Sequence, residues 1–390
     1  EPMSCVAHVT DGRCEVWAPT QGPNDLQAEV ARLLGLAPAA VRVNVTFMGG
    51  GFGRRLGVDF AREAAEVSRR VRAPVQVTWT RSDDMRDGHF QAASIHDLWG
   101  IVDGGRGVAW KHRKISSPHN LSGPPSAEDL KDPVAYFQGL SWGVYDVPYA
   151  FPAIETSYVR VDAPVRIGPW RAVFSPSSTF ARECFLDEMA GVAGVDPLAF
   201  RLAMLAGGPD VVRAGSLEID RRRLRRVLEL AADKSGWGAP LPPGRFRGLA
   251  CNVYDGATHV AYVAEVSARA DVAPDRLPFV VHRVTAAIDC GVIVNPLGIA
   301  AQVEGGVAWG LSNMMAEITF RDGRAEQGSY ADFPIVALGE MPAVELHLVP
   351  SHGDQPFGMG EPTVPPLAPA VANAFFAATG RRIRRLPCTG

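Results

Sequence analysis

The spacing of apolar residues along the first eighty positions changes repeatedly between two periods. Over residues 24–34 apolar side chains recur every three or four positions, which predicts a helix that ends near Gly35. Residues 41–47 alternate between apolar and polar side chains and predict a strand. A second helix is expected from about Asp59, followed by a strand over 75–79. Alternation of this kind favours a layered α/β or α+β fold.

The pattern changes again in the middle of the chain. Residues 104–170 are rich in aromatic residues, glycine and proline, so we expect short strands and loops there. A helix is expected from about Ser177 through Met189. Asp196 followed by Pro197 predicts the start of another helix, because an aspartate can cap it and proline suits its first position. Further along we expect three strands and then two helices, over 249–254, 259–268, 279–289, 297–312 and 368–379.

Residues 236–248 are the best candidate for a domain boundary, because this segment is dense in glycine and proline. It would divide the chain into two units, residues 1–235 and 249–390. The glycine loop described below falls in the first unit, and a glutamate between glycine and proline falls in the second.

Composition narrows the possible functions. The chain has 39 basic and 42 acidic side chains and a formal charge of −3, which argues against nucleic acid or an anionic membrane held by bulk charge. Its six cysteines form no Cys-x-x-Cys pair and have no histidines at zinc-site spacing. We therefore expect neither a structural zinc nor an iron–sulfur cluster in this chain. No apolar run reaches the roughly 20 residues that span a bilayer.

A run of glycines, Gly49–Gly53 with Phe52 inside it, follows the strand predicted over 41–47. Residues without a Cβ let backbone N–H groups come close to an anionic or oxo-bearing ligand. A tight strand-to-helix turn is the alternative interpretation. The run is neither a phosphate-binding loop with Gly-Lys-Ser/Thr nor a complete dinucleotide-binding motif.

Three further side chains are candidates for chemistry. Glu361 stands between Gly360 and a proline, where it could act as a general base or cap the next helix. Gln302, on a helix with several glycines, could donate its amide to a polar ligand or serve helix packing. Arg171 could bind an anion or form a surface ion pair.

In this order the motifs resemble the molybdenum hydroxylases, the xanthine oxidase and aldehyde oxidoreductase family. Within it, Gly-Gly-Gly-Phe-Gly-Arg-Arg and Gly-Glu-Pro-x-x-Pro-Pro-x-Ala-Pro-Ala are similar to the isoquinoline 1-oxidoreductase beta subunits. The resemblance covers essentially the whole chain and implies the α+β fold of a molybdopterin-binding region, with mixed layers of sheets and helices. The motifs that carry it lie at 19–21, 49–55, 168–172, 289–306 and 358–366.

The resemblance also implies roles for individual residues. Glu361 matches the general base of a hydroxylation that takes its oxygen from water, and Gln21 matches a glutamine that bonds the molybdenum oxo group. No side chain is implied as a metal ligand. The cofactor is expected to be molybdopterin cytosine dinucleotide with molybdenum. The residues matched to its binding are Gly50, Gly51, Phe52, Gly53, Arg171, Gln302 and Gly360.

Two departures from the family refine these expectations. Purine-oxidising members carry an acidic residue where this chain has Leu56, so we expect an aldehyde or a neutral N-heteroaromatic substrate. A Gly-Gln-Gly cofactor loop is absent, and the chain starts inside a motif that ends Glu-Pro-Met. We therefore expect the C-terminal half of a large subunit, with the N-terminal half as a separate chain.

The resemblance further implies a small [2Fe–2S] subunit to carry electrons away, with a flavin or cytochrome c subunit as a further candidate. An export signal upstream would place the enzyme in the periplasm; otherwise it is expected in the cytoplasm. Two alternatives stay open. One is a non-catalytic scaffold or assembly protein with the same fold, and the other is a nucleotide-binding module that uses the glycine loop.

Overall fold

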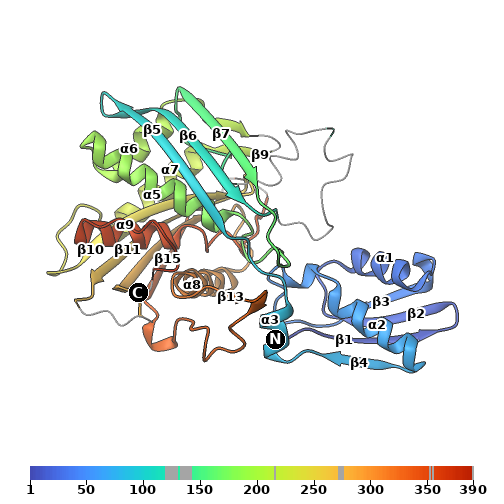
Figure 1. Cartoon of the computed structure of the whole chain (residues 1–390). Helices are drawn as coiled ribbons and strands as arrows, with labels where there is room; N and C mark the ends of the chain where they lie inside the picture. Colours follow the sequence, from blue (N-terminus) through green and yellow to red (C-terminus); the bar gives the residue numbers. More distant parts are fainter. Residues whose placement is uncertain are drawn as a thin grey trace.

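Three hydrophobic cores organise the chain. The computed structural model describes residues 1–118, 131, 143–214, 217–270, 276–350, 353 and 355–388. In these residues one core lies within the first eighty positions, and the other two lie on opposite faces of a sheet near the C-terminus. Figure 1 shows the N-terminal unit set to one side of the rest.

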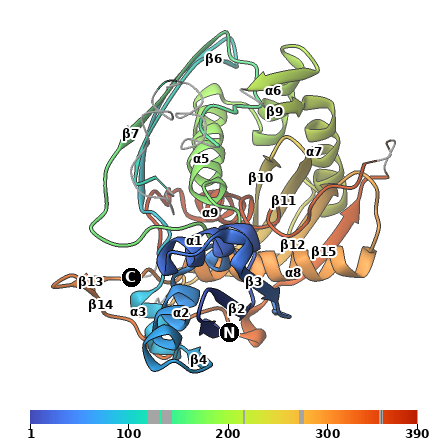
Figure 2. The ribbon, with the colours of Figure 1, turned by 90° about the vertical axis from the view of Figure 1, so that its right-hand side faces the viewer.

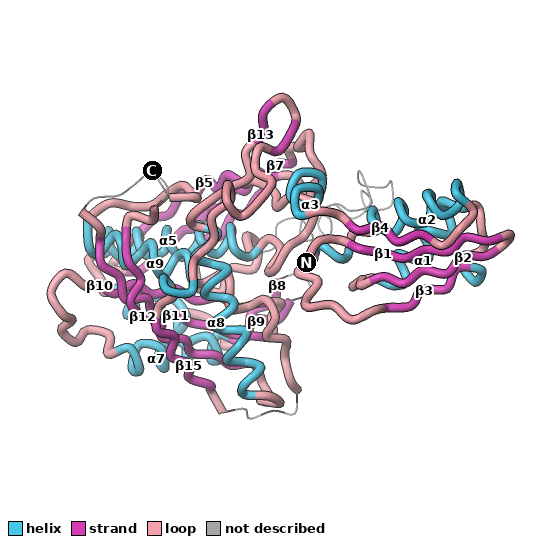
Figure 3. The backbone as a smooth tube through the Cα atoms, turned by 90° about the horizontal axis from the view of Figure 1, so that it is seen from below, coloured by secondary structure: helices cyan, strands magenta, loops and turns pink. Residues whose placement is uncertain are grey.

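The N-terminal unit is a four-stranded sheet, in the order β3-β2-β1-β4, with two helices on it. Leu26 and Val30 of one helix and Phe60 and Ala64 of the other are fully buried against the strands. The helices and strands predicted here are confirmed, and Gly35 ends the first helix in a left-handed conformation, with φ 68°. Figure 3 shows the four strands side by side. The elements are β1 (Ser4–Thr10), β2 (Arg13–Ala18), α1 (Pro23–Leu34), β3 (Val41–Val45), α2 (Asp59–Val71) and β4 (Val75–Thr78).

A three-stranded sheet follows, made of β5 (Ser94–Asp103), β6 (Arg106–Ser116) and β7 (Ala153–Arg160), with α5 (Ser175–Ala193) beside it. Figures 1 and 2 both place α5 next to these strands. The expectation of short strands was wrong for β6, which has 11 residues. The polar residues His112 and Lys114 occupy buried positions of this strand, so its alternation was hidden from a hydrophobicity pattern.

The largest sheet has the order β10-β11-β12-β15 and is covered on both faces. Cys251 and Ala261 belong to the core beneath α7, whereas Ala250 and Tyr262 belong to the core beneath α8 and α9. This alternation is the two-residue period of a strand with two buried faces. The strands and helices predicted here are confirmed. These are β10 (Phe246–Tyr254), β11 (Thr258–Ala268), β12 (Phe279–Asp289), α8 (Pro296–Asn313) and α9 (Leu367–Thr379). The structure adds α7 (Arg221–Ser235) and β15 (Ala343–Leu348).

Short elements connect these layers. The predicted cap is confirmed: the Asp196 side chain accepts hydrogen bonds from the N–H groups of Leu198 and Ala199. The remaining elements are 3₁₀ turns over Pro38–Ala40, Arg54–Leu56 and Leu338–Glu340, with α3 (Arg81–Asp87), α6 (Pro197–Ala206), β8 (Val211–Ala214), β9 (Leu217–Asp220), β13 (Phe320–Arg321) and β14 (Arg324–Ala325). In the described ranges no single helix is long and apolar enough to cross a membrane; α5 and α6 reach that only together, bent by 102°.

The domain division at 236–248 stays a prediction. Helix α7, which precedes this segment, packs on β11 and β12, which follow it. The three larger sheets are mixed sheets. The pairs β2–β3, β6–β7 and β12–β15 are parallel, and the other neighbouring strands are antiparallel.

Candidate functional site

Arg171 brings several of the predicted site residues together. Its side chain is buried; its Nε donates to the carbonyl oxygen of Gly360 at 2.6 Å, and its Nη2 donates to Oε1 of Gln302 at 2.9 Å. The next residue, Ala172, donates its backbone N–H to Oε1 of Glu361 at 3.1 Å. Two successive residues thus bind two successive residues of a loop 189 positions away.

The backbone at Ala172 and Val173 adopts an uncommon conformation. Their φ angles are 74° and 49°, in the left-handed region that residues with a Cβ rarely occupy. This turn directly precedes α5 and brings the N–H of Ala172 to the Glu361 carboxylate. Strain of this kind persists only where surrounding contacts hold it. Arg171, which directly precedes this turn, supplies such contacts through its hydrogen bonds to Gly360 and Gln302.

The glycine loop packs against Gln21 and the Pro169 segment. Gly53 donates its N–H to Oε1 of Gln21 at 3.0 Å. A Cβ on Gly51 would lie 2.3 Å from the Gln21 side chain, and one on Gly53 would lie 2.6 Å from the carbonyl oxygen of Pro169. Gly53 also has φ +84°. Gly53 is therefore required by close approach to backbone, whereas a side chain at Gly51 would displace Gln21.

Trp309 of α8 links the glycine loop to the Arg171 segment. Its ring stacks on Phe52 with centroids 4.9 Å apart, and Trp170 lies 5.3 Å away. The Arg171 guanidinium lies 5.7 Å from the same ring. The predicted residues from the two ends of the sequence therefore meet in one region, although sequence analysis did not single out Trp309. Its separation of seven positions from Gln302 places both on one helix face and could have identified it.

The turn between β10 and β11 supplies a contact that sequence analysis also missed. Thr258 Oγ1 donates to the carbonyl oxygen of Gly358 at 2.9 Å, which ties this turn to the loop that carries Glu361. Burial and the neighbouring Glu361 raise the pKa of Tyr254, so this phenol stays protonated. Burial and then Glu361 also raise the pKa of Asp255. No local sequence signal indicated this turn.

The amides of Gln21 and Gln302 are oriented by their partners. Each oxygen faces a group that can only donate, the N–H of Gly53 for one and the guanidinium of Arg171 for the other. Each NH₂ group therefore points away from these partners. Within the part of the chain that the structure describes, neither NH₂ donates a hydrogen bond. Both are available to a ligand that accepts hydrogen bonds.

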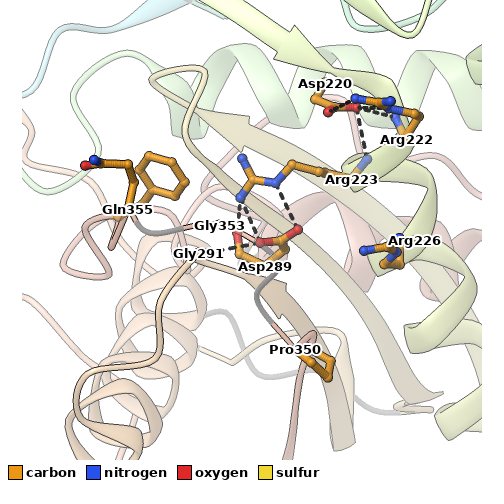
Figure 4. Close-up of a pocket in the computed structure, with 10 residues that line it drawn as sticks. Asp220, Arg222, Arg223, Arg226, Asp289, Gly291, Pro350, Gly353 and Gln355 are labelled. Carbon is orange, nitrogen blue, oxygen red and sulfur yellow. Dashed lines mark hydrogen bonds and ion pairs between the residues drawn. The ribbon is translucent and has the colours of Figure 1, made fainter.

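Asp289 lies in the same sequence motif as Gln302, but its side chain contacts Arg223 rather than the residues around Arg171. It forms a pair of hydrogen bonds with Arg223, with its Oδ1 2.8 Å from Nη2, in the hollow shown in Figure 4. The basic start of α7 lines this hollow through Arg222, Arg223 and Arg226. In the described residues no group of three or more His, Cys, Asp or Glu side chains is arranged to hold a metal ion.

Comparison with known proteins identifies the family. Models described as molybdopterin cofactor-binding domain match residues 1–205 and 250–342. The chain belongs to this family, that of the molybdenum hydroxylases. Its resemblance to them and to the isoquinoline 1-oxidoreductase branch is therefore confirmed.

Two curated relatives match almost the whole chain. One is a subunit of the nicotinate dehydrogenase of Pseudomonas putida, which is 30% identical over 100% of this chain and 33% of its own length. The other is the beta subunit of the isoquinoline 1-oxidoreductase of Brevundimonas diminuta, which is 30% identical over 99% of this chain and 48% of its own. The chain thus spans a third to a half of these relatives, whose names mark them as subunits of larger enzymes.

Solved structures confirm the mixed α+β fold. Quinoline 2-oxidoreductase from Pseudomonas putida 86 superposes with a TM-score of 0.80 at 16% identity, over 99% of this chain and 73% of that one. Aldehyde oxidoreductase from Desulfovibrio gigas gives 0.76 at 17% identity, over 99% of this chain and 58% of that one.

Proposed function

We propose that this chain carries the general base of a molybdenum-dependent hydroxylase large subunit, with Glu361 in that role. The substrate is an aldehyde or a neutral N-heteroaromatic, and water supplies the oxygen. The names of two curated relatives, an isoquinoline oxidoreductase and a membrane-bound aldehyde dehydrogenase, support these two substrate classes, and a nicotinate dehydrogenase supports N-heteroaromatics in general. Leu56, in place of an acidic side chain, supports a substrate without the polar edge of a purine.

The residues present fit a molybdenum–pterin cofactor, which we propose to be the cytosine dinucleotide form. Gln21 and Gln302 offer amide donors to oxo and pterin groups, and the glycines at 50, 51 and 53 leave backbone close to the ligand. Phe52 stacks on Trp309 beside them, and Arg171 holds Gly360 through its carbonyl oxygen. When bound, the cofactor supplies a Lewis-acidic centre and a two-electron acceptor.

Glu361 accepts the proton that water loses as its oxygen adds to the substrate carbon. The backbone N–H of Ala172 donates to its carboxylate at 3.1 Å, which restricts the orientation of the side chain. Preorganisation of this kind matters because a general base must lie within hydrogen-bond reach of the proton it removes. The rings of Phe52 and Trp309 lie between the glycine loop and Arg171.

The observation that carries this proposal is the double contact of Arg171 and Ala172 with Gly360 and Glu361. An isolated glutamate in a glycine turn could cap a helix. Glu361 instead bonds to another segment, whose strained backbone is held beside it. The non-catalytic scaffold of the same fold remains the competing candidate.

The proposal includes partner chains. A chain with the N-terminal half of the large subunit completes the cofactor site, and a small [2Fe–2S] subunit removes electrons. A flavin or cytochrome c subunit is the further candidate for passing them on. The subunit names of the curated relatives support a multi-subunit enzyme of this kind.

The test compares the purified complex with its Glu361→Gln and Glu304→Gln variants. Glu304 is an exposed carboxylate on α8 and serves as the matched control. Molybdenum, iron and the extracted nucleotide are quantified, and turnover is measured with a panel of aldehydes and N-heteroaromatics. We expect Glu361→Gln to keep its molybdenum and lose about 100- to 10,000-fold in turnover, the usual contribution of a general base. Unchanged turnover in Glu361→Gln would contradict the assignment, and a complex without molybdenum would favour the scaffold.

A further inference from the structure

We infer that Thr20 is a positioning residue, whose hydroxyl holds the backbone on both sides of Gln21 and so orients the Gln21 amide beside the glycine loop. This inference rests on the proposed function, because Gln21 is one of the two amide donors offered to the cofactor. Thr20 is 3% exposed, whereas Gln21 is exposed. Packing in a core therefore does not hold the Gln21 side chain, and its orientation depends on hydrogen bonds.

Three successive residues bond to one residue of the turn that follows the glycine loop. Thr20 Oγ1 donates to the carbonyl oxygen of Arg55 at 3.2 Å, and the N–H of Gln21 donates to the same oxygen at 3.0 Å. The buried Arg55 side chain donates in turn from its Nη1 to the carbonyl oxygen of Pro19 at 3.1 Å. The segment that carries Gln21 is therefore tied to the 3₁₀ turn at Arg54–Leu56.

The Thr20 hydroxyl also accepts a hydrogen bond. The N–H of Gly22 donates to Thr20 Oγ1 at 3.1 Å, so the same hydroxyl contacts the residue after Gln21. A hydroxyl can donate and accept at the same time, and Thr20 uses both capacities. Loss of the hydroxyl would therefore remove two of the hydrogen bonds that hold the backbone around Gln21.

The side chain of Gln21 continues this network into the glycine loop. Its Oε1 accepts from the N–H of Gly53 at 3.0 Å, and a Cβ on Gly51 would lie 2.3 Å from the same side chain. Because a glutamine side chain is flexible, its amide keeps this contact only while its backbone is held in place. The described residues show no hydrogen bond between Thr20 and Gly53, so Thr20 acts on the Gly53 N–H through Gln21.

The experiment uses the complete complex and measures hydrogen–deuterium exchange of the Gly53 N–H at single-residue resolution. Thr20→Val replaces the hydroxyl by a methyl group, and Thr20→Ser keeps the hydroxyl. We expect Thr20→Val to raise the exchange rate of Gly53 about fivefold, the change that accompanies loss of one neutral hydrogen bond. Thr20→Ser should exchange like the unaltered complex. In a Gln21→Ala background Thr20→Val should have no further effect, because the side chain that transmits it is gone.

Thr379→Val is the matched control. Thr379 Oγ1 donates to the carbonyl oxygen of Phe375 at 2.8 Å and accepts from the N–H of Arg381 at 3.2 Å, so its hydroxyl makes the same two kinds of bond at the end of α9. This variant should leave the exchange of Gly53 unchanged.

Unchanged Gly53 exchange in Thr20→Val would overturn the inference. A further rise in the Gln21→Ala background would also overturn it, because Thr20 would then act on the glycine loop without Gln21. If Thr20→Val does not fold, Thr20→Ala removes the same hydroxyl and should give the same result.

Turnover per molybdenum atom separates the inference from the proposed function, because hydrogen exchange needs no turnover. We expect turnover of Thr20→Val to fall about fivefold as well, since one hydrogen bond that orients a cofactor donor is lost. Faster Gly53 exchange with unchanged turnover would uphold the orientation of Gln21 by Thr20 and contradict the role of Gln21 toward the cofactor.

Discussion

Arg171 donates from its Nε to the carbonyl oxygen of Gly360 at 2.6 Å, directly before the candidate base. Arg171→Lys keeps the charge but cannot reproduce the planar fork that also bonds Gln302. We expect the free energy of unfolding to fall by about 2 kcal/mol, since bonds from a buried charged donor are lost. The molybdenum content of the purified complex should fall with it. Urea unfolding and metal analysis measure both effects.

Arg113→Lys is the matched control for this change. Arg113 bonds Asp97 on the sheet of β5–β7 and is partly exposed. Its replacement should alter unfolding by less than about 0.5 kcal/mol, as for other partly exposed ion pairs. Equal effects of the two variants would show that Arg171 has no special part in holding the loop.

Gly53→Ala tests the close approach of the glycine loop to Pro169. A Cβ at this position would lie 2.6 Å from a backbone oxygen, and the backbone is also left-handed, with φ +84°. Gly12→Ala is the control, since Gly12 has φ +77° with nothing within 4 Å of the added atom. We expect about 1 kcal/mol of destabilisation for Gly12→Ala, and about 1–3 kcal/mol more for Gly53→Ala. Equal losses in thermal or urea unfolding would contradict the contact with Pro169.

Lys114 is a buried amine whose removal should stabilise the fold. It is 1% exposed, lies 4.5 Å from the centre of the Phe174 ring and has no hydrogen-bond acceptor in the described residues. Burial lowers the pKa of Lys114 to about 7, although the charge of Asp146 opposes this. Lys114→Met removes an unpaired buried cation, so we expect a gain of about 2 kcal/mol at pH 7.

The pH dependence of this gain follows from the direction of the shift. The unfolded chain binds the lysine proton below its ordinary pKa of 10.5, whereas the folded chain binds it only below about 7. Stability of the unaltered protein therefore decreases as the pH falls through this window and then levels off. The advantage of Lys114→Met should shrink as the pH rises from 7 to 10 in urea unfolding. Lys111→Met, at an exposed position paired with Glu155, is the control, and a pH-independent advantage of Lys114→Met would contradict the argument.

The basic run at the start of α7 marks a limit of sequence interpretation. Asp220 caps this helix, since its side chain accepts from the N–H groups of Arg222 and Arg223. A run of arginines suggests a solvated face, yet Arg221 is 6% exposed and donates to the carbonyl oxygen of Pro148 at 2.6 Å. The local sequence can indicate where α7 begins. It cannot indicate that Arg221 is buried, because its acceptor, the carbonyl oxygen of Pro148, belongs to a distant segment.

The amino-acid sequence by itself determined most elements and the order of the motifs. The end of α1 at Gly35, the start of α6 at Asp196 and the strands β10, β11 and β12 depend on residues within a few positions of each other. Periodicity and capping residues therefore reveal them. The glycine loop, Arg171 and Glu361 were also visible as motifs. Their roles in catalysis and cofactor binding stay predictions.

Only the tertiary structure decided which of these residues meet. Ala172 and Glu361 are brought together across 189 positions, and Trp309 links Arg171 to the glycine loop. Such contacts depend on how whole layers pack and on where a strained turn is held. No local pattern encodes them, because the free energy that fixes them is distributed over the cores beneath the site.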